Sequence, residues 1–185
     1  HTNDRRQRQM CIRDSKDSTL VMLLEAQQRN WDIHYLIPDT LFASDGLAYA
    51  KAANLDVSDN NQRWYQIGEV RTLSLADFDL ILMRKDPPFN MEFIYSCYML
   101  GLAAAKGTLV VNNPTSLINF NEKFSILNFP ECCAPTLVSK NIATIQSFLE
   151  QQNNLVIKPL DAMGGQSIFK LMASDLNRNS IIQQM

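Results

Sequence analysis

The segment that most constrains the fold runs from residue 78 to residue 112, because it predicts a strand, a helix and a second strand. Residues 78–83, "FDLILM", form a nearly continuous apolar run that ends in charged residues and a Pro-Pro turn. Such runs are typical of strands buried on both faces of a parallel sheet. An apolar helix, "MEFIYSCYMLGLAAAK", follows with Gly107 as its expected C-cap, and "TLVV" is the next strand. The pattern is a βαβ unit, so we expect an α/β fold with a mainly parallel sheet.

Shorter elements are expected on both sides of this unit. Before it, the sequence predicts a helix over 19–30, a strand over 32–38, a β-hairpin over 41–57 and a strand over 63–70. Asp45-Gly46 is the signature of a type I′ turn in that hairpin. After it, we expect a short amphipathic helix over 119–129, a strand over 134–140, a helix over 142–152, two strands within 154–171 and a helix over 174–185.

Composition excludes several classes of protein. The 185 residues include 17 basic and 19 acidic side chains, a net charge of −2, which gives no electrostatic argument for nucleic acid as a partner. There is no apolar run long enough for a membrane span, and no secretory signal is visible. None of the four cysteines, Cys11, Cys97, Cys132 and Cys133, forms a C-x-x-C pair. We expect them to be reduced thiols, mostly buried, in a cytoplasmic protein.

The first 15 residues, "HTNDRRQRQMCIRDS", differ from the rest because they have no hydrophobic period and four arginines. Their end, "MCIRDS", resembles a translated sequencing-library adapter. We therefore expect residues 1–15 to be a non-native or disordered tail, the alternative being a natural disordered basic tail.

The candidate functional residues surround the stretch "NLVIKPLDAMGGQSIFKL", residues 154–171. Lys158 ends an apolar strand, where ligands bind in open α/β sheets, and its ammonium suits phosphate oxygens. Gly164-Gly165 can bring backbone N–H groups close to an anion. Spacing alone favours a solvated lysine and a plain β-turn. Lys123 adds a second cation, as a triphosphate requires.

A second cluster of charges follows the strand 78–83. Arg84, Lys85 and Asp86 emerge where this strand ends, which is a common place for a substrate site. Arg84 can hold a carboxylate with paired N–H donors. A charged, solvated strand end is an equally good interpretation of these residues alone.

Taken together, the motifs "LILMRKDPPF", "KGTLVVNNPTSL", "NEKF", "APTLV" and "IKPLDAMGGQSIF" resemble the bacterial type of glutathione synthetase, an ATP-grasp ligase. The resemblance covers residues 16–185. It implies a Rossmann-like pre-ATP-grasp domain over 16–117, followed by the first, incomplete part of an ATP-grasp α+β domain over 118–185.

The resemblance also implies a reaction and a set of site residues. The family joins γ-glutamylcysteine to glycine with ATP and Mg²⁺ through an acyl phosphate, and its members tend to form homo-oligomers. The residues that the resemblance tentatively implies for binding the dipeptide are Arg84, Lys85 and Asp86. The implied ATP-binding residues are Lys123, Lys158, Asp161, Met163, Gly164, Gly165 and Ser167. No catalytic residue is assigned.

The sequence departs from the family pattern in several places. Ala162 stands where a glycine is usual, and Gln166 where a small residue is common. The family's first strand is replaced by "RRQRQMCIRDS", and its Mg²⁺ ligands are expected downstream of Met185, since neither Asp161 nor Asp175 matches a metal position. We therefore expect this chain alone to be inactive. The alternatives are an ATP-grasp ligase for another carboxylate and amine, and a non-catalytic nucleotide-binding module.

Overall fold

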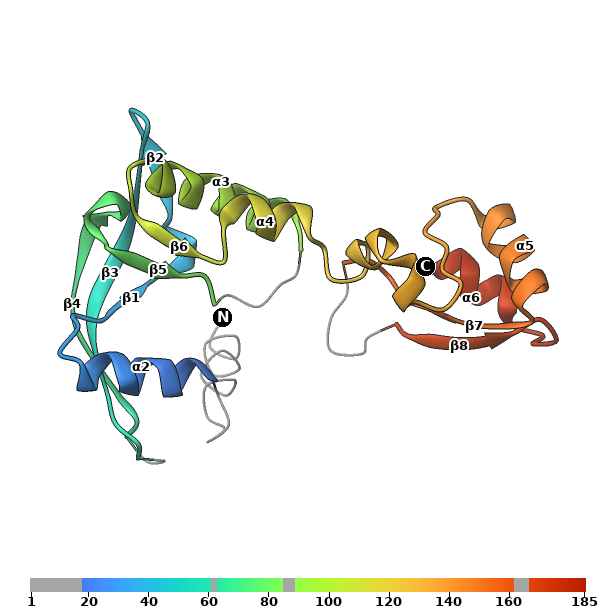
Figure 1. Ribbon diagram of the computed structural model, residues 1–185, viewed down its shortest axis with the longest axis horizontal. Helices are drawn as coiled ribbons and strands as arrows, with labels where there is room; N and C mark the ends of the chain where they lie inside the picture. Colours follow the sequence, from blue (N-terminus) through green and yellow to red (C-terminus); the bar gives the residue numbers. More distant parts are fainter. Residues whose placement is uncertain (1–17, 61–62, 85–88, 162–166) are drawn as a thin grey trace. The chain divides into compact units, whose positions relative to one another are not determined.

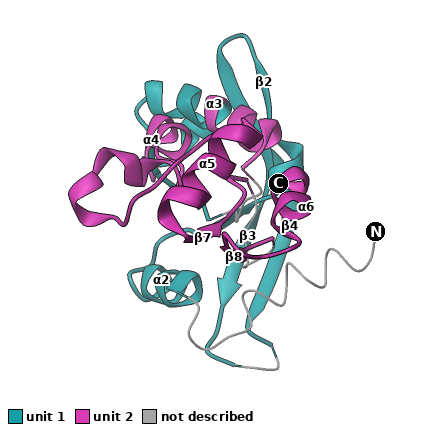
Figure 2. Ribbon diagram, turned by 90° about the vertical axis from the view of Figure 1, so that its right-hand side faces the viewer, with its two compact units in different colours: residues 1–85, 99–111 teal, residues 86–98, 112–185 magenta. Residues whose placement is uncertain are grey.

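A computed structural model describes residues 18–60, 63–84, 89–161 and 167–185. The chain divides into two units, residues 1–85 with 99–111 and residues 86–98 with 112–185 (Figure 2). The chain passes from one unit to the other at three places, one of which, between residues 98 and 99, lies within the helix α3 (Met91–Ala105). Helices and strands occur in both units, which confirms a mixed α/β protein.

The first unit contains a four-stranded antiparallel sheet built around one long strand, β3 (Leu47–Val57). Along one edge, β3 pairs with β1 (His34–Leu36) and β2 (Phe42–Ser44), and along the other with β4 (Tyr65–Ser74). The helix α2 (Ser18–Gln28) packs against β3 (Figure 1). The described helix, strands and hairpin lie where the sequence predicts them.

The β2–β3 hairpin has the turn that its sequence specifies. Asp45 and Gly46 have φ values of 52° and 76°, and Ser44 pairs with Leu47 across the turn. Positive φ at both central residues is the mark of a type I′ turn, whose twist matches that of the flanking strands. The predicted turn is confirmed.

The burial of β3 changes from one face to the other along its length. Ala48 and Ala50 are buried in the first half, whereas Leu55 and Val57 are buried near the end. Since alternate residues of a strand point to opposite faces, each half of β3 buries a different face. Near this transition the pairing with β4 shifts register, with two β4 residues opposite Asn54.

The predicted βαβ unit is confirmed. The strands β5 (Leu80–Leu82) and β6 (Leu109–Val111) pair in parallel, and α3 connects them. The helix ends in a Schellman motif, in which the N–H of Gly107 donates to Ala104 O (3.1 Å) and that of Thr108 to Ala103 O (3.3 Å). Gly107 has a φ of 109°, as its role requires.

The expectation of a mainly parallel sheet is not confirmed. Among the described residues only β5 and β6 pair in parallel, and the larger sheet is antiparallel throughout. The reason is that β1 pairs with β3, the long strand of the β2–β3 hairpin, instead of with β5. The core of the unit joins both sheets to α3 through Ala48, Ala50, Leu75, Ile81, Leu100, Ala103 and Val110.

The second unit has a smaller core formed by helices and a two-stranded antiparallel sheet. The elements are α4 (Pro114–Asn119), α5 (Ile142–Gln152), β7 (Asn154–Ile157), β8 (Phe169–Met172) and α6 (Arg178–Gln184). Leu149, Leu171 and Ile182 are its buried centre. The predicted helix over 142–152 and the strand pair are confirmed; the last helix is shorter than expected.

Two predictions for this unit are wrong. Residues 119–129 do not form an amphipathic helix, because the side chain of Asn121 takes the N–H groups of Lys123 and Phe124, and only a 3₁₀ turn, η3 (Ser125–Asn128), follows. Residues 134–140 form no strand. In the described part of the chain, the neighbouring strand β7 pairs only with β8.

No described helix is both long and apolar enough to cross a membrane.

One side chain of α2 replaces a strand partner at the end of β3. The Nε2 of Gln27 donates to Val57 O, and the N–H of Val57 donates to Gln27 Oε1, both at 2.8 Å. We expect Gln27→Met, which keeps the length of the side chain but removes both bonds, to lower the free energy of unfolding by about 1–3 kcal/mol. Chemical denaturation measures this change.

The matched control is Gln28→Met, because Gln28 is the next residue of the same helix and is exposed. It should change the free energy of unfolding by less than about 0.5 kcal/mol. Equal effects of the two substitutions would show that the paired bonds to Val57 do not anchor α2.

Candidate functional site

The two-stranded sheet of the second unit has one covered face and one open face. Leu155 of β7 and Leu171 of β8 are paired in register and belong to the core beneath the sheet. The alternate residues Val156 and Met172 are 54% and 46% exposed. Single exposed apolar residues are common, but here they lie on one side of a sheet whose other side is packed. This open face is the candidate surface for a ligand.

Lys158 extends this open face beyond the end of β7. Exposed and partly buried residues alternate from Asn154 to Leu160, so Val156, Lys158 and Leu160 share the exposed side. Lys170 lies opposite Val156 in the strand register and is also exposed. The face therefore combines apolar side chains with two cations, which suits a ligand that has a flat apolar part and an anionic part.

Lys123 is held by a turn that Asn121 organises. The Oδ1 of Asn121 accepts from the N–H groups of Lys123 and Phe124, both at 3.0 Å. The Lys123 side chain is only 20% exposed, and its Nζ lies 3.7 Å from Oε1 of Glu122, which is itself 70% exposed. Because this distance is long and the carboxylate is open to solvent, the pair contributes little to stability.

Asn121 also connects this turn to the strand that carries Lys158. Its Nδ2 donates to the carbonyl oxygen of Leu160 at 3.5 Å, a long bond between residues 39 positions apart. The turn with Lys123 and the strand end with Lys158 thus lie next to one another. The structure thus brings together the segments that carry two of the lysines that the sequence singled out.

The loop between β7 and β8 contains the other predicted nucleotide residues. Asp161 follows Leu160 and is exposed, and Ser167 is exposed with a φ of 55° at the far end of the loop. Met163, Gly164 and Gly165 lie outside the described residues.

The candidate dipeptide residue Arg84 lies in the first unit. Its Nη2 donates to Ser18 Oγ at 3.0 Å and its Nε to Thr19 Oγ1 at 3.2 Å, so it contacts the first turn of α2. The guanidinium is exposed and has further N–H donors beyond these two. Lys85 and Asp86 lie outside the described residues.

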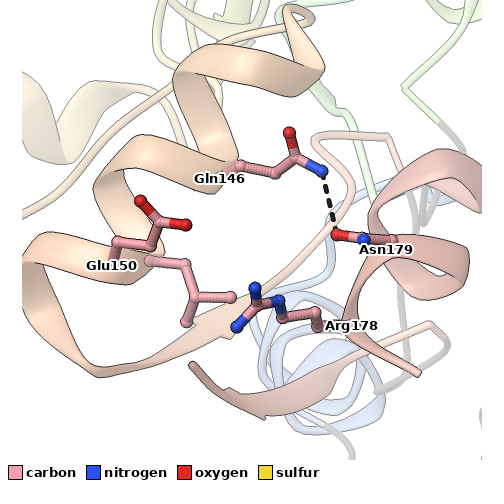
Figure 3. Close-up of a pocket in the computed structure, with 5 residues that line it drawn as sticks. Gln146, Glu150, Arg178 and Asn179 are labelled. Atoms are coloured by element: carbon pink, nitrogen blue, oxygen red, sulfur yellow. Dashed lines mark hydrogen bonds between the residues drawn. The ribbon is translucent and has the colours of Figure 1, made fainter. Parts of the chain in front are cut away.

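A hollow of about 130 Å³ between α5 and α6 does not involve any predicted site residue (Figure 3). It is lined by Gln146, Leu149, Glu150, Arg178 and Asn179, and the Nε2 of Gln146 donates to Asn179 Oδ1 at 2.9 Å. Because one acidic and one basic side chain line it, this hollow has no excess of positive charge for a phosphate.

Sequence reasoning missed Asn121 and Lys170. Asn121 could have been recognised as the first residue of an Asx turn, since Asn side chains commonly bond to backbone N–H groups two and three positions later. Lys170 could have been placed by alternation, because Leu171 is the buried residue beside it.

Two family models match consecutive parts of the chain. The model for the prokaryotic glutathione synthetase N-terminal domain matches residues 9–117, and the model for the prokaryotic glutathione synthetase ATP-grasp domain matches residues 122–185. The predicted ATP-binding lysines lie in the part matched by the second model, and Arg84 in the part matched by the first.

Curated relatives agree with these matches. A glutathione synthetase of Xylella fastidiosa strain Temecula1 is 42% identical over 174 residues, and one of Escherichia coli O6:H1 is 44% identical over the same length; each alignment covers 94% of this chain and 55% of the relative. One of Pseudomonas putida KT2440 is 45% identical over 170 residues, covering 92% and 54%. The chain thus spans about half the length of these curated relatives.

The chain combines an N-terminal α/β domain with part of an ATP-grasp domain, the architecture of an ATP-grasp ligase. It belongs to the prokaryotic glutathione synthetase family.

The two functions of Asn121 can be separated by substitution. Asn121→Asp keeps an oxygen that accepts from Lys123 and Phe124 but loses the donor to Leu160, whereas Asn121→Ala loses both. We expect Asn121→Ala to destabilise the unit by about 1 kcal/mol and to speed amide hydrogen exchange at Lys123 and Phe124. In Asn121→Asp these two amides should stay protected. Hydrogen exchange read by mass spectrometry measures both effects.

Asn128→Ala is the control, because Asn128 is exposed in the neighbouring 3₁₀ turn. It should leave exchange at Lys123 and Phe124 unchanged. If Asn121→Asp and Asn121→Ala exchange equally fast there, the side-chain oxygen does not hold the turn.

Proposed function

We propose that the protein to which this chain belongs joins γ-glutamylcysteine and glycine to form glutathione, with cleavage of ATP to ADP and phosphate. The observation that carries this proposal is the match of both prokaryotic glutathione synthetase domains, in order, over most of the chain. The two groups of charged residues described above, Arg84 in the first matched part and the lysines in the second, are chemically suited to the substrates.

The nucleotide is proposed to bind on the open face of β7 and β8. Val156 and Met172 offer an apolar surface for the adenine, and Lys158 and Lys123 offer charge for the phosphates. A lysine ammonium is a compact charge that binds phosphate well. The loop residues assigned to ATP are Asp161, Met163, Gly164, Gly165 and Ser167.

The proposed reaction has two steps. A carboxylate oxygen of the dipeptide attacks the γ-phosphorus of ATP, so that an acyl phosphate forms and ADP leaves. The amine of glycine then attacks the acyl carbon, loses a proton, and expels phosphate as the amide bond forms. Negative charge develops on phosphate oxygens in the first step, and cations held in place lower its energy. Lys123 and Lys158 are proposed for that role.

Arg84 is proposed to bind a carboxylate of the dipeptide. Its bonds to Ser18 and Thr19 fix the guanidinium at the start of α2 while leaving further donors available. A negative group is also favoured near the N-terminus of a helix. Lys85 and Asp86 follow Arg84 directly and complete this tentative set.

Mg²⁺ is the metal that the family uses with ATP, and no residue of this chain is assigned to it. Within the described ranges, no three His, Cys, Asp or Glu side chains gather closely enough to hold a metal ion. The roles proposed for Lys123, Lys158 and Arg84 are binding and charge neutralisation.

The remaining features of the proposal concern organisation and location. We place the domains at residues 16–117 and 118–185, with residues 1–15 outside both. The small-molecule partners are ATP, γ-glutamylcysteine and glycine, and the complete protein is expected to form a homo-oligomer. A cytoplasmic location is supported by the thiols of Cys97, Cys132 and Cys133, which are free.

A chimera tests the function. It joins this chain to the remaining C-terminal part of the Escherichia coli relative, of which the chain covers 55%. We expect phosphate release that requires ATP, glycine and γ-glutamylcysteine together. Lys158→Ala should lower kcat/KM for ATP by roughly 10–100-fold, because charge-assisted hydrogen bonds contribute about 1.5–3 kcal/mol.

Lys140→Ala serves as the control, since Lys140 is an exposed lysine of the same unit just before α5. It should leave kcat/KM unchanged. Phosphate release with a different amine or carboxylate, but not with glycine and γ-glutamylcysteine, would contradict the assigned substrates. A folded chimera without any ATP-dependent activity would contradict the ligase function.

A further inference from the structure

Two adjacent cysteines at the end of a 3₁₀ turn have no part in the proposed nucleotide site. The turn, η4, spans Pro130–Cys132, and Cys133 follows it. The sequence suggested buried thiols, and this is wrong for Cys132, which is exposed; Cys133 is half-buried. Cys97 does meet the expectation, because it is buried in α3, where loss of solvation raises the pKa of its thiol.

The backbone around the pair is held in place by hydrogen bonds. The N–H of Cys132 donates to Phe129 O at 3.0 Å, and that of Cys133 to Pro130 O at 3.3 Å. The one described side-chain bond of Cys133 is weak, since its Sγ lies 3.6 Å from the carbonyl oxygen of Ile126. A ligand that takes both sulfurs therefore displaces little.

The spacing of the two residues disfavours a disulfide between them. Adjacent Cα atoms are about 3.8 Å apart across a trans peptide, whereas disulfides usually join Cα atoms roughly 4.4–6.8 Å apart. A larger atom inserted between the sulfurs lengthens the bridge and relieves this mismatch. Thiolates select soft partners. Because no third His, Cys, Asp or Glu side chain joins the pair in the described part of the chain, the partner must be satisfied by two sulfurs.

We propose that Cys132 and Cys133 form a chelating site for trivalent arsenic compounds of the type R–As=O. Each thiol forms one S–As bond and gives up its proton. The two protons and the arsenoxide oxygen leave as water, and arsenic stays trivalent, so the reaction needs no oxidant or reductant. The product is a ring closed through arsenic, the two side chains and the peptide unit between them.

The second S–As bond gives the pair a higher affinity for arsenic than two separate thiols have. Once one sulfur is bound, the other is a neighbour in the same chain, and its effective concentration is high. Linking two binding groups in this way raises overall affinity by roughly 100-fold or more. Single thiols, including the exposed sulfur of a Cys133→Ser variant, cannot close the ring.

Phenylarsine oxide is the probe that tests the site, with intact mass of the folded chain as the readout. We expect one phenylarsenic adduct per chain that survives excess 2-mercaptoethanol and is removed by 2,3-dimercaptopropanol. Cys132→Ser and Cys133→Ser should each weaken binding by roughly 100-fold or more, so that the monothiol strips the adduct. Cys97→Ser and Cys11→Ser are matched controls and should bind as the unchanged chain does.

Serine suits both test positions, because it replaces an exposed thiol at Cys132 and can still donate to Ile126 O at position 133. Circular dichroism verifies that each variant is folded. If Cys133→Ser does not fold, the binding measured for Cys132→Ser tests the proposal on its own. An adduct that 2-mercaptoethanol removes from the unchanged chain, or one lost in Cys11→Ser or Cys97→Ser, overturns the proposal. Because the readout is binding, its result is independent of the proposed ligase activity.

Discussion

The pairing of β3 along both of its edges is the interaction on which the first unit depends. One edge binds β1 and β2, and the other binds β4 along most of its length. The buried residues in its first half are alanines, of which Ala50 is fully buried. Small side chains at these positions let Leu100 and Ala103 of α3 join the same core. The βαβ unit thus packs on a surface that β3 provides, and α2 is fixed to the far end of the same strand through Gln27.

The second unit has a smaller core and a sheet that is covered on one side only. The core is centred on Leu149, Leu171 and Ile182, which lie beneath the β7–β8 sheet. Val156 and Met172 therefore remain in contact with water, which is unfavourable for apolar side chains. A face of this kind gains stability when an apolar surface covers it, and the lysine next to it makes an anionic, partly apolar ligand a good match. The same property that weakens the sheet makes this face the candidate binding surface.

The features that the sequence predicted correctly are set by local chemistry. Asp45-Gly46 specifies its turn because few other pairs accept positive φ twice, and Gly107 ends α3 for a similar reason. The antiparallel pairing of β1 with β3 could not be predicted in this way, because Tyr35 and Ala53 are far apart in the sequence. Local reasoning also failed over 119–129, where apolar spacing indicated a helix but the Asn121 side chain competed for the backbone N–H groups.

For the candidate site, motifs identified Lys123 and Lys158 but not the contact between the segments that carry them. That information lies in a hydrogen bond from Asn121 to Leu160, which no sequence pattern reveals. The chemical nature of this link matters. A carboxylate at position 121 could accept the same two N–H groups, but its charge would offset that of Lys123. The carboxamide is neutral, so it fixes the turn without adding a second negative charge beside Lys123, whose Nζ already lies 3.7 Å from Oε1 of Glu122.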